Sequence, residues 1–327
     1  MIERDSRDAV FAEIARLAAA DSQVFVLTND MGALGLDALR AAHPERVINV
    51  GIAEQNLVSV AAGLALTGKL VFTYGILAHV TARCYEQLRL DVCAARLPVI
   101  GLGVGSGLSY GVDGPTHHGI YDLGLLRALP GLALYNPADG VTAAAAVRLA
   151  AAGRGPAFIR LDKEAPEPLY DPRAQSFAAG VAVLEAGADA TIIATGCSVH
   201  RALAAARRLR SEGIAVTVVD CFRLKPVPDG LVRTVLRDAR AIVTVEEHAH
   251  TGGLGTIVAE QLAAMGSAPR FARLALDDVV YLGATSRAWA EEHCGIGTAG
   301  IARTVRGLVE PAWAAVPAAA AAAGSAA

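Results

Sequence analysis

The chain has 327 residues, of which 54% are hydrophobic and 19% charged, and its formal net charge is -3 at pH 7. This supplies enough length for two domains and enough apolar residues for a large core. It lacks the clustered basic residues that nucleic-acid binding requires, and no apolar run reaches the length of a membrane span. None of the five cysteines forms a CxxC pair, and the charged N-terminus has no apolar signal-peptide core. We therefore expect a cytoplasmic protein that binds neither nucleic acid nor membrane.

The first half, residues 1–162, alternates short β-branched runs with Ala- and Leu-rich stretches. The strand runs are continuously apolar, which is typical of parallel strands covered by helices on both faces. The pattern predicts a doubly wound, mostly parallel α/β sheet. The predicted helices cover 7–20, 53–67, 80–95, 120–128 and 139–152, and the predicted strands cover 24–27, 47–50, 70–74, 98–104, 132–135 and 157–161.

The same alternation returns in the second half after a break. Residues 163–188 are rich in Pro, Asp and Glu and are predicted to be a linker. A second, smaller α/β domain of the same mostly parallel kind is predicted over 189–315, and the Ala-rich tail 316–327 is predicted to be disordered. Its predicted strands cover 190–195, 214–219, 241–246 and 272–276, and its predicted helices cover 198–212, 229–238, 254–265 and 297–310.

Ligands of open α/β sheets bind beyond the carboxyl ends of the strands. In the first domain this rule selects the loops 28–35, 50–56, 74–80 and 105–119. The stretches with the most distinctive polar residues fall in these loops.

The first such stretch is Gly51-Ile52-Ala53-Glu54-Gln55-Asn56. It places Glu54 in the first turn of a helix, directly after a strand. The acid is there either because the helix dipole favours it, or because a desolvated carboxyl group with a raised pKa shares a proton with a ligand nitrogen.

The second stretch is Asp113-Gly114-Pro115-Thr116-His117-His118-Gly119. Its glycines and proline predict a sharp irregular loop. The loop is either a turn with surface histidines or a polar cluster for hydroxyl and carbonyl groups, in which histidine provides proton transfer near neutral pH. The two adjacent histidines lack a further ligand at metal-binding spacing, so we do not predict a metal site.

The third stretch, residues 246–255, reads EEHAHTGGLG. Its glycines between a strand and a helix would suit an anion. Because the lysine of a phosphate-binding loop is absent, we interpret it as a structural turn.

In chain order, four segments resemble motifs of the transketolase family: GIAEQN, YEQLRLDVCAARLPV, DGPTHHG and VTVEEHAHTGGLG. The resemblance extends over residues 7–310. It implies an enzyme that binds thiamine diphosphate between domains of different chains. The family's diphosphate- and Mg²⁺-binding domain carries a GDG motif, which this sequence lacks. The chain thus resembles the beta half of a split transketolase, which implies a separate alpha subunit holding the Mg²⁺ and an α2β2 assembly.

On the cofactor side, the resemblance assigns Glu54 to the pyrimidine ring nitrogen, with Gln55 beside it. Asp30 matches an acid near the thiazolium ring. His79 falls at the position where the family stacks a phenylalanine on the pyrimidine, although a solvent-facing histidine at a helix start is an equal interpretation.

On the substrate side, the resemblance assigns His117 and Asp113 to sugar hydroxyls, with His118 next to them. Two phosphate-binding positions of the family differ here, because Gly105 replaces a histidine and Asn136 an arginine. The charge-assisted phosphate contact of arginine is therefore lost. Arg160 and Lys163 are candidate replacements, and we expect a substrate that differs from ordinary pentose phosphates.

We thus expect transfer of a two-carbon ketol unit from a ketose to an aldehyde-type acceptor. Two alternatives remain. One is a 2-oxoacid-decarboxylating enzyme, like deoxyxylulose-phosphate synthases or the beta subunits of dehydrogenases. The other is a non-catalytic subunit of an assembly.

Overall fold

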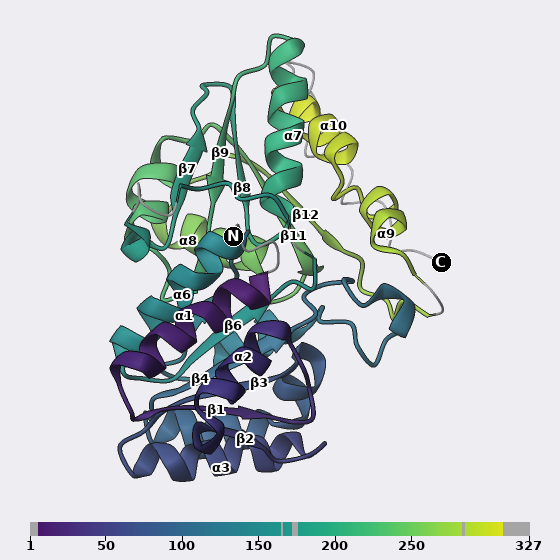
Figure 1. Ribbon diagram of the computed structural model, residues 1–327. Helices are drawn as coiled ribbons and strands as arrows, with labels where there is room; N and C mark the ends of the chain where they lie inside the picture. Colours follow the sequence, from purple (N-terminus) through teal and green to yellow (C-terminus); the bar gives the residue numbers. More distant parts are fainter. Residues whose placement is uncertain (1–5, 165, 172–175, 283–284, 310–327) are drawn as a thin grey trace, which may run out of the picture.

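The computed structural model describes residues 6–164, 166–171, 176–282 and 285–309, which form two α/β domains (Figure 1). Each domain contains one mostly parallel sheet flanked by helices, as predicted from the sequence. Within the described ranges, no helix is long and apolar enough to cross a membrane.

The first sheet has seven strands in the order β10-β5-β6-β4-β3-β1-β2. All its pairings are parallel except the one between β10 and β5. Because β1 has β2 on one side and β3 on the other, the chain reverses direction across the sheet at β1. The strands are β1 (Val24–Thr28), β2 (Val47–Asn49), β3 (Leu70–Ile76), β4 (Val99–Val104), β5 (Ala133–Tyr135), β6 (Ala157–Leu161) and β10 (Arg223–Lys225).

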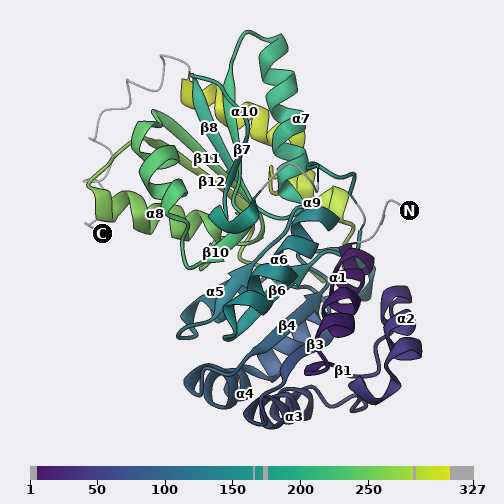
Figure 2. The same ribbon diagram turned by 60° about the vertical axis from the view of Figure 1, so that its left-hand side comes forward.

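Helices cover both faces of this sheet (Figures 1 and 2). One face packs against α1 (Ser6–Ala20), α2 (Leu34–Ala42) and α6 (Gly140–Gly153). The other packs against α3 (Glu54–Leu66), α5 (Asp122–Ala128) and a helical segment that follows β3. That segment has π-helical turns at His79–Arg83 and Leu88–Ala94 on either side of α4 (Tyr85–Gln87).

The second sheet has five strands in the order β12-β11-β8-β9-β7. Helices α7 and α10 pack together against one face, and α8 covers the other (Figure 2). The strands are β7 (Ala182–Glu185), β8 (Ala190–Ala194), β9 (Val216–Asp220), β11 (Ala241–Ala249) and β12 (Arg270–Leu276). The helices are α7 (Ser198–Ser211), α8 (Leu254–Met265), α9 (Arg287–His293) and α10 (Thr298–Val309), with a π-helical segment at Leu231–Leu236.

The structure corrects the predicted boundaries in two places. The predicted linker 163–188 contains β7, which pairs antiparallel with β9 and so belongs to the second sheet. The strand β10 follows β9 in the chain, yet it pairs with β5 of the first domain. Both are edge strands of three or four residues, too short to show a periodicity in the sequence. The predicted tail 316–327 lies outside the described residues.

Candidate active site

Glu54 is the first residue of α3 and lies beyond the carboxyl end of β2. Gly51 makes the tight turn between them with φ of +75°. The Glu54 side chain is buried, with the residue only 6% exposed. It borders a hollow of about 360 Å³ whose other lining residues are Ile52, Ala53, Gln55, Asn56 and Arg83.

Two basic side chains lie beside the Glu54 carboxylate. Its Oε1 is 3.3 Å from Nη1 of Arg83 and 3.5 Å from Nδ1 of His79. Burial favours the neutral acid, but the backbone N–H of Glu54, Arg83 and His79 together outweigh burial and lower the pKa of Glu54. The raised pKa expected from the sequence is therefore wrong for this chain on its own.

His79 connects Glu54 to the loop that follows β4. Its Nε2–H donates to the backbone carbonyl of Thr116 at 3.1 Å, because a carbonyl can only accept. Burial, together with the charge of Arg83, lowers the pKa of His79. The imidazole is therefore neutral near pH 7, and Nδ1 faces Glu54 as an acceptor.

The loop between Gly107 and Gly119, named here the 107–119 loop, is closed at its base by two hydrogen bonds. Each of the two glycines donates its backbone N–H to the carbonyl of the other, over 2.9 and 3.0 Å. The loop brings the ring of His117 to a centroid distance of 5.2 Å from His79 and 5.8 Å from Tyr110. Glu54, His79, His117 and Tyr110 thus form one continuous cluster.

The other predicted residues of the cofactor side are open to a ligand. Asp30 is exposed at the end of β1, in a left-handed conformation with φ of 67°. Asn49 fixes it there, since its amide donates to Oδ1 of Asp30 at 3.1 Å while its own oxygen accepts the Asp30 backbone N–H. Gln55 is also exposed.

The predicted substrate residues divide into open and buried ones. Asp113 and Lys163 are exposed, and the Lys163 ammonium lies 4.5 Å from the centre of the Tyr110 ring. His118, by contrast, is 4% exposed and its Nε2–H donates to the carbonyl of Gly111. Asn136 is 2% exposed and donates to Thr195 Oγ1 in the second domain. Neither His118 nor Asn136 is therefore open to a ligand in this structure, contrary to our expectation.

Arg160, a candidate replacement for the missing phosphate contact, is also buried. Its Nε donates to Asp122 at 2.8 Å, and its Nη2 donates to the carbonyls of Gly119 and Glu247. It holds the base of the 107–119 loop instead of facing a substrate. Arg83, which sequence reasoning missed, contacts Glu54; its signal was its position one helical turn after His79.

The glycine-rich stretch after β11 is a structural turn, as interpreted from the sequence. The carboxylate of Glu246 accepts the backbone N–H groups of Leu254 and Gly255 at 2.7 and 2.8 Å. The N-terminus of α8 therefore already holds an anionic group from its own chain. In the part of the chain that the structure describes, no group of three His, Cys, Asp or Glu side chains is arranged to hold a metal ion.

Comparison with known proteins gives matches to both domains. Residues 3–167 match the family model for the transketolase pyrimidine-binding domain, and residues 179–301 match that for the transketolase C-terminal domain. One of the two subunits of apulose-4-phosphate transketolase from Phocaeicola vulgatus is 34% identical over 91% of this chain and 95% of its own length. A subunit of 6-deoxy-6-sulfo-D-fructose transketolase from a Clostridium species is 35% identical over 78% of this chain and 80% of its own length.

Solved structures agree with these matches. A split-gene transketolase, described as an inactive beta4 tetramer, superposes with a TM-score of 0.85 and 33% identity over 93% of this chain and 98% of that chain. A Pichia stipitis transketolase bound to sedoheptulose 7-phosphate shares the fold at a TM-score of 0.78 and 20% identity, over 93% of this chain and 46% of that chain. The resemblance seen in the sequence is thereby confirmed: this chain belongs to the transketolase family of thiamine-diphosphate-dependent transferases, as a chain of the split, beta-subunit type.

Proposed function

We propose that this chain is the pyrimidine-binding half of a split transketolase and is active only with a separate diphosphate- and Mg²⁺-binding subunit. One observation carries the proposal. The Glu54 carboxylate lies in a hollow bordered by residues 52–56 and Arg83, at the edge of the molecule, and the sequence has no GDG motif. The split-gene neighbour is inactive as a beta4 tetramer, which supports the same division of labour.

The residues around this hollow fit the pyrimidine half of thiamine diphosphate. A carboxylate at a helix N-terminus suits a ring nitrogen, and the half-buried imidazole of His79 offers a flat surface and an acceptor next to it. Thiamine diphosphate, when bound, supplies the electron sink for cleaving a bond next to a carbonyl. Glu54, His79, Gln55 and Asp30 are the residues that we propose to hold it.

We assign the following roles to the chain's own groups. The Glu54 carboxyl group holds or releases a proton at the ring nitrogen of the pyrimidine. His117 lies against His79 and reaches a donor sugar near its carbonyl, where it hydrogen-bonds and moves protons. The exposed carboxylate of Asp113, on the same loop, accepts from a sugar hydroxyl.

We further propose that Lys163 binds a terminal anionic group of the substrate. A side chain at position 105, where the family has a phosphate-side histidine, would have its Cβ 2.3 Å from the Tyr110 ring. The same ring carries the ammonium of Lys163 at the outer end of the cluster. The relatives named for apulose 4-phosphate and 6-deoxy-6-sulfofructose act on sugars with a terminal anion, so the anionic end is the expected handle.

Replacing Lys163 with Gln tests this assignment. We expect the KM for a phosphorylated or sulfonated ketose to rise about tenfold, since one charge-assisted contact is lost. The KM for a neutral ketose, measured with the same variant in the same complex, should not change. An equal effect on both ketoses would contradict the assignment.

For the assembly we propose an α2β2 complex in the cytoplasm. The decisive experiment is calorimetric titration of the purified chain with thiamine diphosphate and Mg²⁺, first alone and then with the protein encoded beside it. We expect no binding alone and clear binding in the complex, followed by ketol transfer in a donor screen. Tight Mg²⁺-dependent binding by the chain alone would overturn the split-enzyme proposal.

The same complex distinguishes the alternatives. The chain is also 36% identical to a 1-deoxy-D-xylulose-5-phosphate synthase from Geobacter sulfurreducens, over 93% of this chain and 48% of that protein. Release of CO₂ from pyruvate without ketol transfer would favour a decarboxylating enzyme. Cofactor binding with neither activity would favour a non-catalytic subunit.

A further inference from the structure

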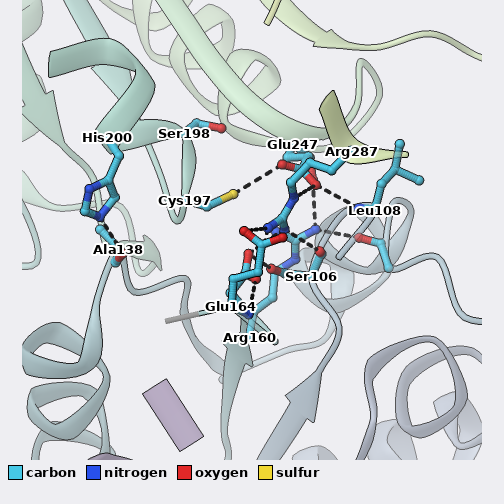
Figure 3. A network of polar contacts seen from close by, with 12 residues as sticks. Ser106, Leu108, Ala138, Arg160, Glu164, Cys197, Ser198, His200, Glu247 and Arg287 are labelled. Atoms are coloured by element: carbon cyan, nitrogen blue, oxygen red, sulfur yellow. Dashed lines mark hydrogen bonds and ion pairs between the residues drawn. The ribbon is translucent and has the colours of Figure 1, made fainter. Parts of the chain in front are cut away.

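The base of the 107–119 loop is held by the second domain through one buried group of charges. Glu247 on β11 lies at its centre and is 3% exposed. Its Oε1 accepts the backbone N–H of Leu108 at 2.8 Å and Nε of Arg287 at 2.9 Å (Figure 3). Its Oε2 accepts Nη2 of Arg201 at 2.8 Å and the thiol of Cys197 at 3.3 Å.

Arg287, the first residue of α9, extends this group into the first domain. Its Nη2 donates to Asp162 Oδ2 at 2.6 Å and to the carbonyl of Ser106 at 3.4 Å. Ser106 in turn donates its hydroxyl to Asp162 at 3.0 Å. Ser106 and Leu108, which flank the first residue of the loop, are thus both bound by side chains of the second domain.

The space around the loop base leaves little room for an alternative position. A Cβ at Gly107 would lie 2.3 Å from the Glu247 carboxylate, and one at Gly111 would lie 2.1 Å from the carbonyl of Thr285. Burial raises the pKa of Glu247, but Arg287, Arg201 and the Leu108 N–H lower it to about 2 overall, so the group stays ionised. Burial raises the pKa of the Cys197 thiol to about 12, so it stays a donor.

We propose that Glu247 and Arg287 are positioning residues, which fix the 107–119 loop from the second domain and so set the place of His117 against His79. Neither side chain is placed in the hollow or on a substrate, so they act only through the loop. This assigns the second domain a part in the reaction of the first. The kinetic part of the proposal rests on the proposed function, while the structural part does not.

The test compares Glu247→Gln and Arg287→Lys with Glu246→Gln. Glu246 is the matched control because it is the neighbouring residue on β11, is equally buried, and caps α8 without contacting the loop. Hydrogen exchange of backbone amides in the isolated chain reports on the loop directly. We expect exchange at residues 107–119 to become about tenfold faster or more in both test variants and to stay unchanged in the control, because a lost buried charge contact exposes the loop to opening.

In the assembled enzyme, we expect kcat to fall about tenfold to 100-fold in the test variants, since a displacement of about 1 Å at a reacting group has effects of this size. The affinity for thiamine diphosphate should stay within about twofold of the wild type, because neither residue contacts the Glu54 hollow. A purely structural role would instead lower cofactor affinity and activity together, as in a partly unfolded sample.

Three outcomes would overturn the proposal: unchanged loop exchange, loop exchange that rises equally in Glu246→Gln, or unchanged kcat in an active complex with a loosened loop. If Glu247→Gln does not fold, Arg287→Lys keeps the charge and still decides the question. If the wild-type complex has no transketolase activity, the proposed function fails while the exchange comparison still tests the positioning.

Discussion

Glu54 shows how much one carboxyl group depends on its neighbours. Its position after a strand and at a helix start was readable from the sequence, but the charge of Arg83 beside it was not, because that residue lies 29 positions away. In the chain alone the neighbours keep Glu54 ionised. A proton carrier at this position therefore needs the partner and the cofactor to complete its surroundings.

We expect Glu54→Gln to lower kcat of the assembled enzyme about 100-fold to 10,000-fold, because the amide cannot carry the proton. The variant still offers an oxygen to Arg83, so the isolated chain should fold and bind its partner as the wild type does. Steady-state kinetics with a ketose donor give the measurement. Glu45→Gln, at an exposed acid just before β2, is the control and should leave kcat unchanged; an equal loss in both variants would contradict the assigned role.

A second carboxyl group, Asp220 at the end of β9, is buried with no role in the site. Tyr170 Oη donates to its Oδ2 at 2.7 Å, yet burial raises the pKa of Asp220 to about 8. The unfolded chain has an ordinary value of about 3.9. Between these values unfolding releases a proton, so this group's contribution to stability is complete below about pH 4 and is lost as the pH rises towards 8.

Asp220→Asn should therefore be more stable than the wild type at pH 7.5 and similar to it near pH 4. Its advantage should widen with pH by up to about 1.4 kcal/mol per unit over this window. Chemical denaturation at several pH values measures the difference in free energy of unfolding. Parallel curves for the two proteins would show that Asp220 titrates normally.

At the scale of elements, prediction succeeded where a segment was long and periodic. Helix α3 was predicted at 53–67 and occupies Glu54–Leu66, and β4 was predicted at 98–104 and occupies Val99–Val104. The elements missed were α2, α9, β7 and β10. The two strands have three or four residues, and β10 is held mainly by its pairing across the domain boundary, which no local pattern reveals.

The strand β10 also stabilises α5 through Lys225. Its ammonium donates to the carbonyl of Arg127 at 2.7 Å and to that of Leu129, at the C-terminal end of the helix. Lys225→Met should lower the free energy of unfolding by about 1.5–3 kcal/mol, because these carbonyls lose a charged donor. Thermal denaturation measures this. Arg89→Met, which removes an exposed pair with Glu86, should cost less than about 1 kcal/mol, and equal losses would contradict the capping role.

For the whole molecule, the sequence sufficed to place Glu54, Asp113 and His117 at one edge of the first sheet, since strand ends converge there. It did not suffice for the residues that hold them. Glu247 and Leu108 are 139 positions apart, and Arg287 and Asp162 are 125 apart, so their contacts depend on the docking of two domains. The same docking buries Asn136 and Arg160, which motif comparison alone had placed near a substrate.

The edge that carries Glu54 is also apolar at its rim. Ile52 is 78% exposed and Leu34 is 81% exposed, and Ile52 lines the hollow itself. Exposed apolar side chains around a half-built site mark a surface that another protein covers. If the partner subunit docks here, a charge at Ile52 will be buried without a counterion, which costs several kcal/mol.

Ile52→Asp should therefore weaken the affinity for the partner subunit about tenfold or more without changing the fold of the isolated chain. Leu66→Asp is the matched control, since Leu66 is 72% exposed and lies at the other end of α3, about 20 Å along the helix. Calorimetry with the partner measures both affinities, and circular dichroism verifies the folds. Equal weakening by the two variants would place the partner on a different surface, whereas loss at Ile52 alone would locate it over the Glu54 hollow, where the second half of the active site has to be.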